Sequence, residues 1–278
     1  MNRNANPSDT YFELTDIKTD NWRIKKLKTW RQESGLSSIA RGRQKEQIVL
    51  MWIYRWGWAS AGMIDKLAGS PNNGYAKKLE RHKLIQGVRT ESGGGRKGVP
   101  NFIFTLTEFG QQEVERNVEV LLNCELDPYR INQANLRHDE LTQQATCKAL
   151  NETQIITEFS TPKERTSLYK KGIKDFDVIW TKIDGEKLGI EVELTGKWSR
   201  KLDQFISSLH TALIEKVVTE VMIVTDSRAI HTRYSSAFKA GSTYFLWSKD
   251  SQSRWKTTES KQVSEEFSER VKCVLLEN

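Results

Sequence analysis

The sequence predicts a two-domain protein of the α/β (α+β) class, on three observations. Its 278 residues are enough for two domains, each with its own core. Helical periodicity of apolar residues dominates the stretch from 44 to 117, whereas residues 134–248 alternate helical segments with short β-rich runs. A polar stretch at residues 118–133 separates the two and is expected to be a linker.

Composition favours a cytoplasmic protein with an anionic partner. Hydrophobic residues make up 37% of the chain, mean hydropathy is −0.61, and no apolar run is long enough to cross a membrane. The first ten residues lack the apolar core of a secretion signal, and the three cysteines form no disulfide or metal-ligand spacing. A net charge of +7 and an isoelectric point near 9.2 fit nucleic acid.

Residues 1–43 form a polar, basic extension in which cations are interleaved with tryptophan. Two explanations stay open: contact with DNA, or a solvated charged surface. The residues concerned are Trp22, Lys25, Lys26, Lys28, Trp30 and Arg31.

The first domain, residues 44–117, starts with three predicted helices. They are Gln44–Trp56, Ser60–Leu67 and Pro71–Lys83, the last with Ser70 as N-cap and proline at its first position. The exposed face of the third helix is basic and rich in amides, which makes it a candidate DNA-binding surface. Its candidate residues are Asn72, Asn73, Tyr75, Lys77, Lys78 and Arg81.

Two strands and a last helix follow, at Leu84–Val88, Phe102–Leu106 and from Thr107 to Val114. The hairpin tip between the strands is rich in glycine and carries Arg96 and Lys97, a combination that lets the backbone approach phosphate. This order of elements resembles a winged helix-turn-helix domain, in which the third helix enters the major groove and the wing touches the backbone or minor groove. The alternative is a domain for dimerisation or protein contacts.

The second domain, residues 134–248, combines predicted helices with strands, and residues 249–278 form a partly helical tail. Its helices are Ala134–Leu150, Lys201–Val218 and Arg228–Phe238, and a charged loop covers Thr161–Lys174. Its strands are Gln154–Phe159, 176–180, 189–194, Glu220–Thr225 and Thr243–Trp247.

Carboxylates interrupt the central hairpin of this domain. Glu191 and Glu193 alternate with apolar residues, so they share one face of the strand, and Asp177 opens the strand before it. Buried acids are costly unless they hold a cation, and oxygen ligands suit Mg²⁺ or Mn²⁺. The hairpin therefore predicts a divalent-metal site at Asp177, Glu191 and Glu193.

Helix, three strands, helix, strand (αβββαβ) resembles the restriction-endonuclease-like core with its PD-(D/E)xK motif. The resemblance implies that Asp177 and Glu191 bind the metal, which activates water for phosphodiester cleavage. Glu193 stands where that motif usually has lysine, as a second metal ligand or general base, and Lys197 is a candidate for the missing cation.

The hairpin turn offers a sharp test of this interpretation. With a two-residue turn at Asp184-Gly185, Asp177 would pair opposite Val192 and face away from both glutamates. A bulge or an odd-length loop would bring Asp177 into line with them. The catalytic interpretation therefore predicts one of these two irregularities.

His138 is a further catalytic candidate, at the start of the first helix of this domain. The alternative is a histidine packed in the core. Glu140 or Glu158 is a candidate for an additional acid from the same region.

The run from His138 to Leu141, Asp177 and the segment from Ile190 to Lys197 together resemble the MobC-type relaxases of mobilisable plasmids and the related replication-relaxation proteins. This resemblance implies a metal-dependent enzyme that binds double-stranded DNA at an origin of transfer and nicks one strand, together with other relaxosome proteins. The four histidines form no His-x-His pair, so ordinary relaxase chemistry with tyrosine and paired histidines is not expected. Two alternatives remain: a transposase-type or repair endonuclease, and a non-catalytic DNA-binding protein for replication or regulation.

Overall fold

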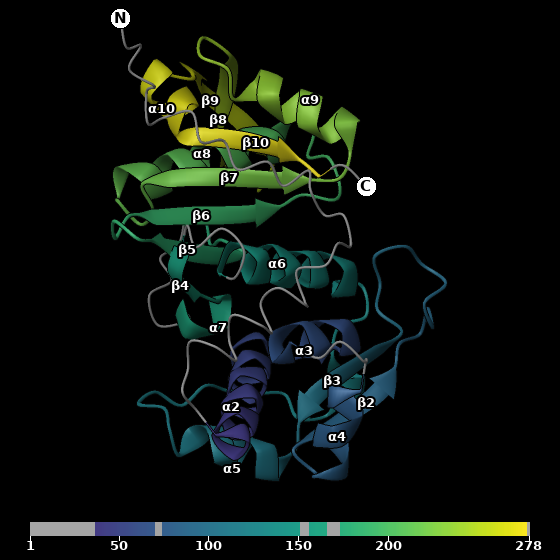
Figure 1. Ribbon diagram of the computed structural model, residues 1–278. Helices are drawn as coiled ribbons and strands as arrows, with labels where there is room; N and C mark the ends of the chain where they lie inside the picture. Colours follow the sequence, from purple (N-terminus) through teal and green to yellow (C-terminus); the bar gives the residue numbers. More distant parts are fainter. Residues whose placement is uncertain (1–36, 70–73, 151–155, 166–172, 277–278) are drawn as a thin grey trace, which may run out of the picture.

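The structure, a computed structural model, describes residues 37–69, 74–150, 156–165 and 173–276. Mixed helices and three separate sheets give these residues an α+β architecture (Figure 1). Most of the predicted basic extension lies outside the described residues. None of the described helices combines the length and apolar character that a membrane span needs.

The N-terminal part packs helices around a small antiparallel sheet. Its elements are α2 (Ser38–Trp56), β1 (Ala59–Ser60), α3 (Ala61–Ala68), α4 (Tyr75–Arg81), β2 (Ile85–Arg89), β3 (Phe102–Leu106) and α5 (Glu108–Glu115). Strand β3 lies in the middle and pairs with both β1 and β2.

Hydroxyl side chains set the starts of three of these helices. Ser37, Ser60 and Thr107 each accept a hydrogen bond from a backbone N–H in the first turn of the helix that follows. Helix α2 therefore starts at Ser38, six residues before the predicted start, because Ser37 caps it. Helix α4 begins only at Tyr75; the predicted cap Ser70 and residues 71–73 lie outside the described residues.

The segment predicted as a linker is instead packed against the N-terminal part. It contains η2 (Pro128–Arg130), and the backbone carbonyl of Leu126 accepts hydrogen bonds from Gln86 Nε2 at 2.7 Å and from Thr105 Oγ1. Leu122 and Leu126 join the apolar core, which explains why this polar-looking stretch does not stand free.

The C-terminal part builds around a five-stranded mixed sheet. Its helices are α6 (Leu136–Lys148), α7 (Pro162–Arg165), α8 (Arg200–Ile214), α9 (Arg228–Ala237) and α10 (Glu265–Arg270). Its strands are β4 (Ile156–Ser160), β5 (Val178–Lys182), β6 (Lys187–Val192), β7 (Glu220–Thr225), β8 (Thr243–Lys249), β9 (Trp255–Gln262) and β10 (Val271–Leu275).

The order of strands corrects two predictions. The sheet runs β10-β7-β6-β5-β4, with β10, β7 and β6 parallel and the remaining pairs antiparallel. Strand β8, predicted to complete this sheet, pairs only with β9 in a separate two-stranded sheet. The fifth strand is β10, which lies in the predicted tail. The segment from Val271 to Leu276 hydrogen-bonds to β7 and runs parallel to it. The second domain therefore extends past residue 248.

Apolar layers cover both faces of the five-stranded sheet. One cluster continues from α2 through α6 to Trp180 and Ile190, so the two parts of the chain share a core. Within it, Trp52 Nε1 donates a 2.7 Å hydrogen bond to the buried amide of Gln143. The other face packs against α8 and α9, as Figure 1 shows. Strand β6 is the central strand of this sheet, so these two apolar layers hold its C-terminal end in place.

Candidate active site

The loop between β5 and β6 has the odd length that the catalytic interpretation requires. Val178 pairs with Ile190, and the pairing continues without a shift until Lys182 N donates to Glu186 O at 2.8 Å. This leaves a three-residue loop, in which Gly185 adopts a φ of 85° that favours glycine. The register places Asp177 opposite Glu191, so the prediction of an odd-length loop is confirmed.

Asp177 lies between the backbone of β6 and helix α6. Its Oδ2 accepts hydrogen bonds from Val192 N at 2.7 Å and from His138 Nε2 at 3.0 Å. Its own backbone N–H donates to Glu191 Oε1 at 3.2 Å. Asp177 and Glu191 are therefore immediate neighbours.

Glu191 is only 3% exposed, and its carboxylate is paired with Lys174 Nζ at 2.7 Å. Burial and, next, the negative charge of Asp177 together raise the pKa of Glu191 to about 7, against the opposing charge of Lys174. Two neighbouring acids, one with a raised pKa, are typical of a site where a bound cation would stabilise the ionised carboxylates.

Glu193 is held apart from this pair. Lys197 Nζ forms an ion pair with its Oε1, and Tyr234 OH donates to its Oε2 at 3.2 Å. Burial lowers the pKa of Lys197, while the charge of Glu191 opposes that shift. Lys197 is thus paired directly with Glu193, and its pKa also responds to the charges of Glu191 and Asp177.

The donor set determines whether a metal ion fits. Across the residues that the structure describes, no group of three or more His, Cys, Asp or Glu side chains is arranged to hold a metal. The three-carboxylate metal site at Asp177, Glu191 and Glu193 stays a prediction; all three line the same cleft. Mg²⁺ commonly binds through one or two carboxylates, with water and substrate phosphate as its other ligands. Asp177 and Glu191 fit that smaller requirement.

His138 is not packed in the apolar core but hydrogen-bonded between two acids. Its Nδ1 lies 2.9 Å from Asp139 Oδ1, while Nε2 faces Asp177. Burial alone would lower the pKa of His138, but the hydrogen bonds and charges of Asp139 and Asp177 outweigh it and raise the pKa to about 10. The raised pKa favours the protonated imidazole, which donates from both ring nitrogens.

Glu140 does not contribute to this site. It is buried on another face of α6, where its Oε1 accepts from Ser60 Oγ at 2.9 Å and from Gln144 Nε2 at 2.8 Å. It packs against the N-terminal part, so it is not the additional acid considered for this region.

The acids lie in a cleft of about 1110 Å³ that both parts of the chain line. Arg96, Lys97 and Val99 from the hairpin tip line this cleft together with His138, Asp177, Glu191, Glu193 and Lys197. In Figure 1 the loop between β2 and β3 extends beside the end of α6. The cleft therefore combines acids and two predicted DNA-binding cations in one lining.

Apolar packing and one arginine hold the hairpin tip in this position. Trp58, Ile103 and Leu136 form a buried cluster that joins the hairpin to the start of α6. Gly98, with φ of 78°, lies against Arg137, and a Cβ there would come within 3.2 Å of that side chain. Arg137 is in turn paired with Asp226 after β7.

The other predicted DNA-binding residues lie elsewhere. Lys77, Lys78 and Arg81 belong to α4, which does not line the cleft, and Asn72 and Asn73 lie outside the described residues. Tyr75 also belongs to α4; its ring is half-buried, its hydroxyl donates to Gly42 O at 3.4 Å, and its contact with DNA stays a prediction. Tyr75 therefore packs α4 against α2.

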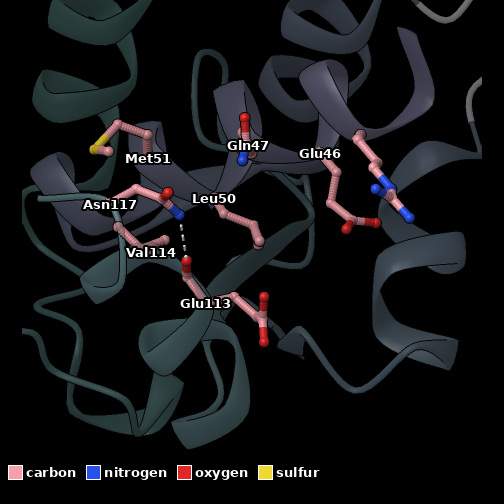
Figure 2. Close-up of a pocket in the computed structure, with 8 residues that line it drawn as sticks. Glu46, Gln47, Leu50, Met51, Glu113, Val114 and Asn117 are labelled. Atoms are coloured by element: carbon pink, nitrogen blue, oxygen red, sulfur yellow. Dashed lines mark hydrogen bonds between the residues drawn. The ribbon is translucent and has the colours of Figure 1, made fainter. Parts of the chain in front are cut away.

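A second hollow, of about 470 Å³, lies between α2 and α5. Figure 2 shows its mixed lining, in which Asn117 donates to Glu113 O at 3.1 Å. The lining residues are Arg43, Glu46, Gln47, Leu50, Met51, Glu113, Val114 and Asn117. Its charged residues, Arg43, Glu46 and Glu113, are fewer than those that line the larger cleft.

Searches against family models, curated proteins and solved structures found no match to this chain. Its function is therefore argued from the cleft.

Lys174 and Tyr234 are the site residues that the sequence did not identify. Lys174 ends the predicted charged loop, and only its place three residues before Asp177 could have drawn attention to it. Tyr234 gives no local signal, because its contact with Glu193 joins positions 41 residues apart.

Proposed function

We propose that this protein is a metal-dependent DNA endonuclease that joins a winged-helix DNA reader to a restriction-endonuclease-like core. The observation that carries the proposal is the cleft itself. Two adjoining acids, Asp177 and Glu191, line one cavity together with Arg96 and Lys97. Acids for a divalent cation and arginine or lysine for phosphate are the two requirements of phosphodiester hydrolysis.

In this proposal the acidic residues bind the metal ion and the basic residues bind phosphate. Asp177 and Glu191 would hold Mg²⁺ or Mn²⁺, which supplies Lewis-acid polarisation of the phosphate and a more acidic water. Arg96 and Lys97 would bind phosphates of the DNA strand that is cut and so fix the position of that strand. His138, kept protonated by its two acid neighbours, donates to Asp177 and holds that carboxylate in position.

Lys197 takes part of the role of the motif's missing lysine. Its ammonium neutralises Glu193, and its lowered pKa makes it a better proton donor and acceptor than an exposed lysine. Glu193, bonded to Lys197 and Tyr234, orients that lysine and is not assigned to the metal.

The resemblance to MobC-type relaxases supports a physiological role at an origin of transfer. There the enzyme would bind double-stranded DNA and nick one strand for plasmid mobilisation, with other relaxosome proteins as partners.

One observation favours a second candidate, a non-catalytic DNA-binding protein. Lys174 and Lys197 already neutralise Glu191 and Glu193 by direct ion pairs. Such internal neutralisation would stabilise a nuclease-like scaffold that cuts nothing.

Nicking of supercoiled plasmid that carries a candidate origin, with Mg²⁺ or Mn²⁺, separates these candidates. We expect Asp177→Asn to abolish nicking and to keep DNA binding. Asp184→Asn is the matched control, because Asp184 lies in the turn of the same hairpin and outside the cleft. Binding without nicking by the unaltered protein would support the scaffold, and equal nicking by all three proteins would refute the catalytic assignment.

A further inference from the structure

Two exposed tryptophans lie near the start of α8: Trp198, two residues before this helix, and Trp255, which contacts Arg200. Trp198 is 67% exposed and Trp255, on β9, is 39% exposed. Each carries a guanidinium on its ring: Arg233 lies 3.4 Å from the ring centroid of Trp198, and Arg200 lies 4.6 Å from that of Trp255. Arg200 follows Trp198 by two residues, so both rings belong to one surface.

The backbone holds Trp198 in this position. Ser199 has a φ of 45°, a conformation that is costly for a residue with a Cβ. Arg233 Nε donates to the carbonyl of Lys197 at 2.9 Å, which ties α9 to the residue before Trp198. Burial of the indole does not compensate for this strain, since the ring projects outward.

The cations of this surface have no acidic partners within the described ranges. No ion pair involves Arg200, Arg233 or Lys249, and Lys249 Nζ lies 5.4 Å from the ring of Trp255. The nearby acids are already engaged: Asp250 pairs with Arg254 and Lys256, and Asp203 accepts from Trp247 Nε1 at 2.8 Å. The surface therefore presents positive charge together with aromatic faces.

This surface continues directly from the catalytic cleft. Lys197 lines the cleft, and Trp198 is the next residue. A strand of DNA whose phosphate lies at Asp177 and Glu191 needs only to follow the chain past Lys197 to reach Trp198.

We propose that Trp198 and Trp255 form a stacking surface for unpaired bases of single-stranded DNA that leaves the cleft. Aromatic rings stack on any base, and adjacent cations bind the phosphates between the bases, which is how sequence-tolerant single-strand binding is built. The identity of the strand as DNA rests on the proposed function, whereas the stacking surface rests on its own residues. An enzyme with this surface keeps one strand unpaired beside the site of cleavage.

Binding of a fluorescein-labelled oligothymidine of about 20 nucleotides, followed by fluorescence anisotropy with a chelator present, tests the proposal. We expect Trp198→Ala and Trp255→Ala each to weaken binding about tenfold, the usual size of a base–aromatic stack. Trp198→Phe should stay within about threefold of the unaltered protein, because a stacking ring remains. Phe109→Ala is the matched control: Phe109 is 49% exposed on α5, far from the cleft.

Binding within twofold of the unaltered protein by both alanine variants would overturn the stacking surface. A loss shared by the Phe109 control would overturn it too, since the effect would then be general. The metal-dependent nicking assay tests the endonuclease proposal separately. If the alanine variants bind oligothymidine more weakly but the unaltered protein does not nick DNA, the stacking surface is supported and the endonuclease proposal is wrong.

Discussion

Helix α6 and the β5–β6 hairpin each bury a glutamate, and the two glutamates differ in what surrounds them. Glu140 of α6 is 8% exposed and accepts hydrogen bonds from the neutral groups of Ser60 and Gln144. Glu191 of the hairpin is 3% exposed and contacts Asp177 and Lys174. Burial raises the pKa of both.

This comparison shows that burial and a raised pKa do not by themselves indicate an active site. Glu140 accepts both of its hydrogen bonds through Oε1, its buried Oε2 has no hydrogen-bond partner among the described residues, and it lies in the packing between the two parts of the chain, outside the lining of the cleft. Glu191 has charged neighbours and lines a cleft together with Arg96 and Lys97. A direct ion pair and a place in the lining of the cleft distinguish Glu191 from Glu140.

Replacing the two glutamates in turn gives the largest expected difference. Glu191→Gln should lower the initial rate of metal-dependent nicking at least about a hundredfold, because it removes a candidate metal ligand. Glu140→Gln should stay within about twofold, because an amide can keep the bonds to Ser60 and Gln144. Circular dichroism checks the fold of both, and equal losses would show that Glu191 is no more functional than Glu140.

Metal binding should distinguish the same two variants by stability. Mg²⁺ at ten times its dissociation constant should stabilise the protein by about 1.4 kcal/mol, which raises the melting temperature by roughly 3–6 °C. Glu140→Gln should keep this gain and Glu191→Gln should lose it, as measured by differential scanning calorimetry with and without chelator. A gain retained by Glu191→Gln would place the metal elsewhere.

The same gain should depend on pH. Because the pKa of Glu191 is raised to about 7, the folded protein binds this proton more tightly than the unfolded chain does. Without metal, the free energy of unfolding therefore falls as the pH rises from about 4.5 to 7. Below pH 7 the metal must compete with that proton. Stabilisation by Mg²⁺ should therefore be larger at pH 8 than at pH 6; an equal gain would contradict the assignment of Glu191.

The protonation of His138 should respond to the hairpin and not to Glu140. Asp177→Asn removes one of the two acids that raise the pKa of His138, and should lower that pKa by about one unit or more. Glu140→Gln should leave it unchanged. The imidazole resonances in an NMR titration measure both, and an unchanged pKa in Asp177→Asn would remove Asp177 as its partner.

The smallest effect concerns the turn that sets the register of the hairpin. Gly185→Ala should lower the free energy of unfolding by about 1 kcal/mol, because alanine is strained at a φ of 85°. Open space surrounds Gly185, so the register and the nicking rate should persist. Urea denaturation gives the stability, and loss of nicking alone would show that the turn is coupled to the acids.

The sequence by itself determined most of the local structure and the central acids. Periodicity and capping residues predicted α3, α5 and α8 closely, since these signals act within a few residues. Alternation along one strand identified Glu191, and the spacing to Asp177 required the odd-length loop that the structure has. Each of these inferences depends on neighbours in the chain.

Only the tertiary structure decided which distant residues meet. Arg96 and Lys97 line the same cleft as the acids because apolar packing fixes the hairpin against α6. Tyr234 reaches Glu193 across 41 residues, and Arg137 reaches Asp226 across 89. The last strand of the sheet is β10 and not β8, because pairing with β7 depends on which segment the whole fold brings beside it. Such contacts follow from the packing of entire layers, which no short pattern in the sequence encodes.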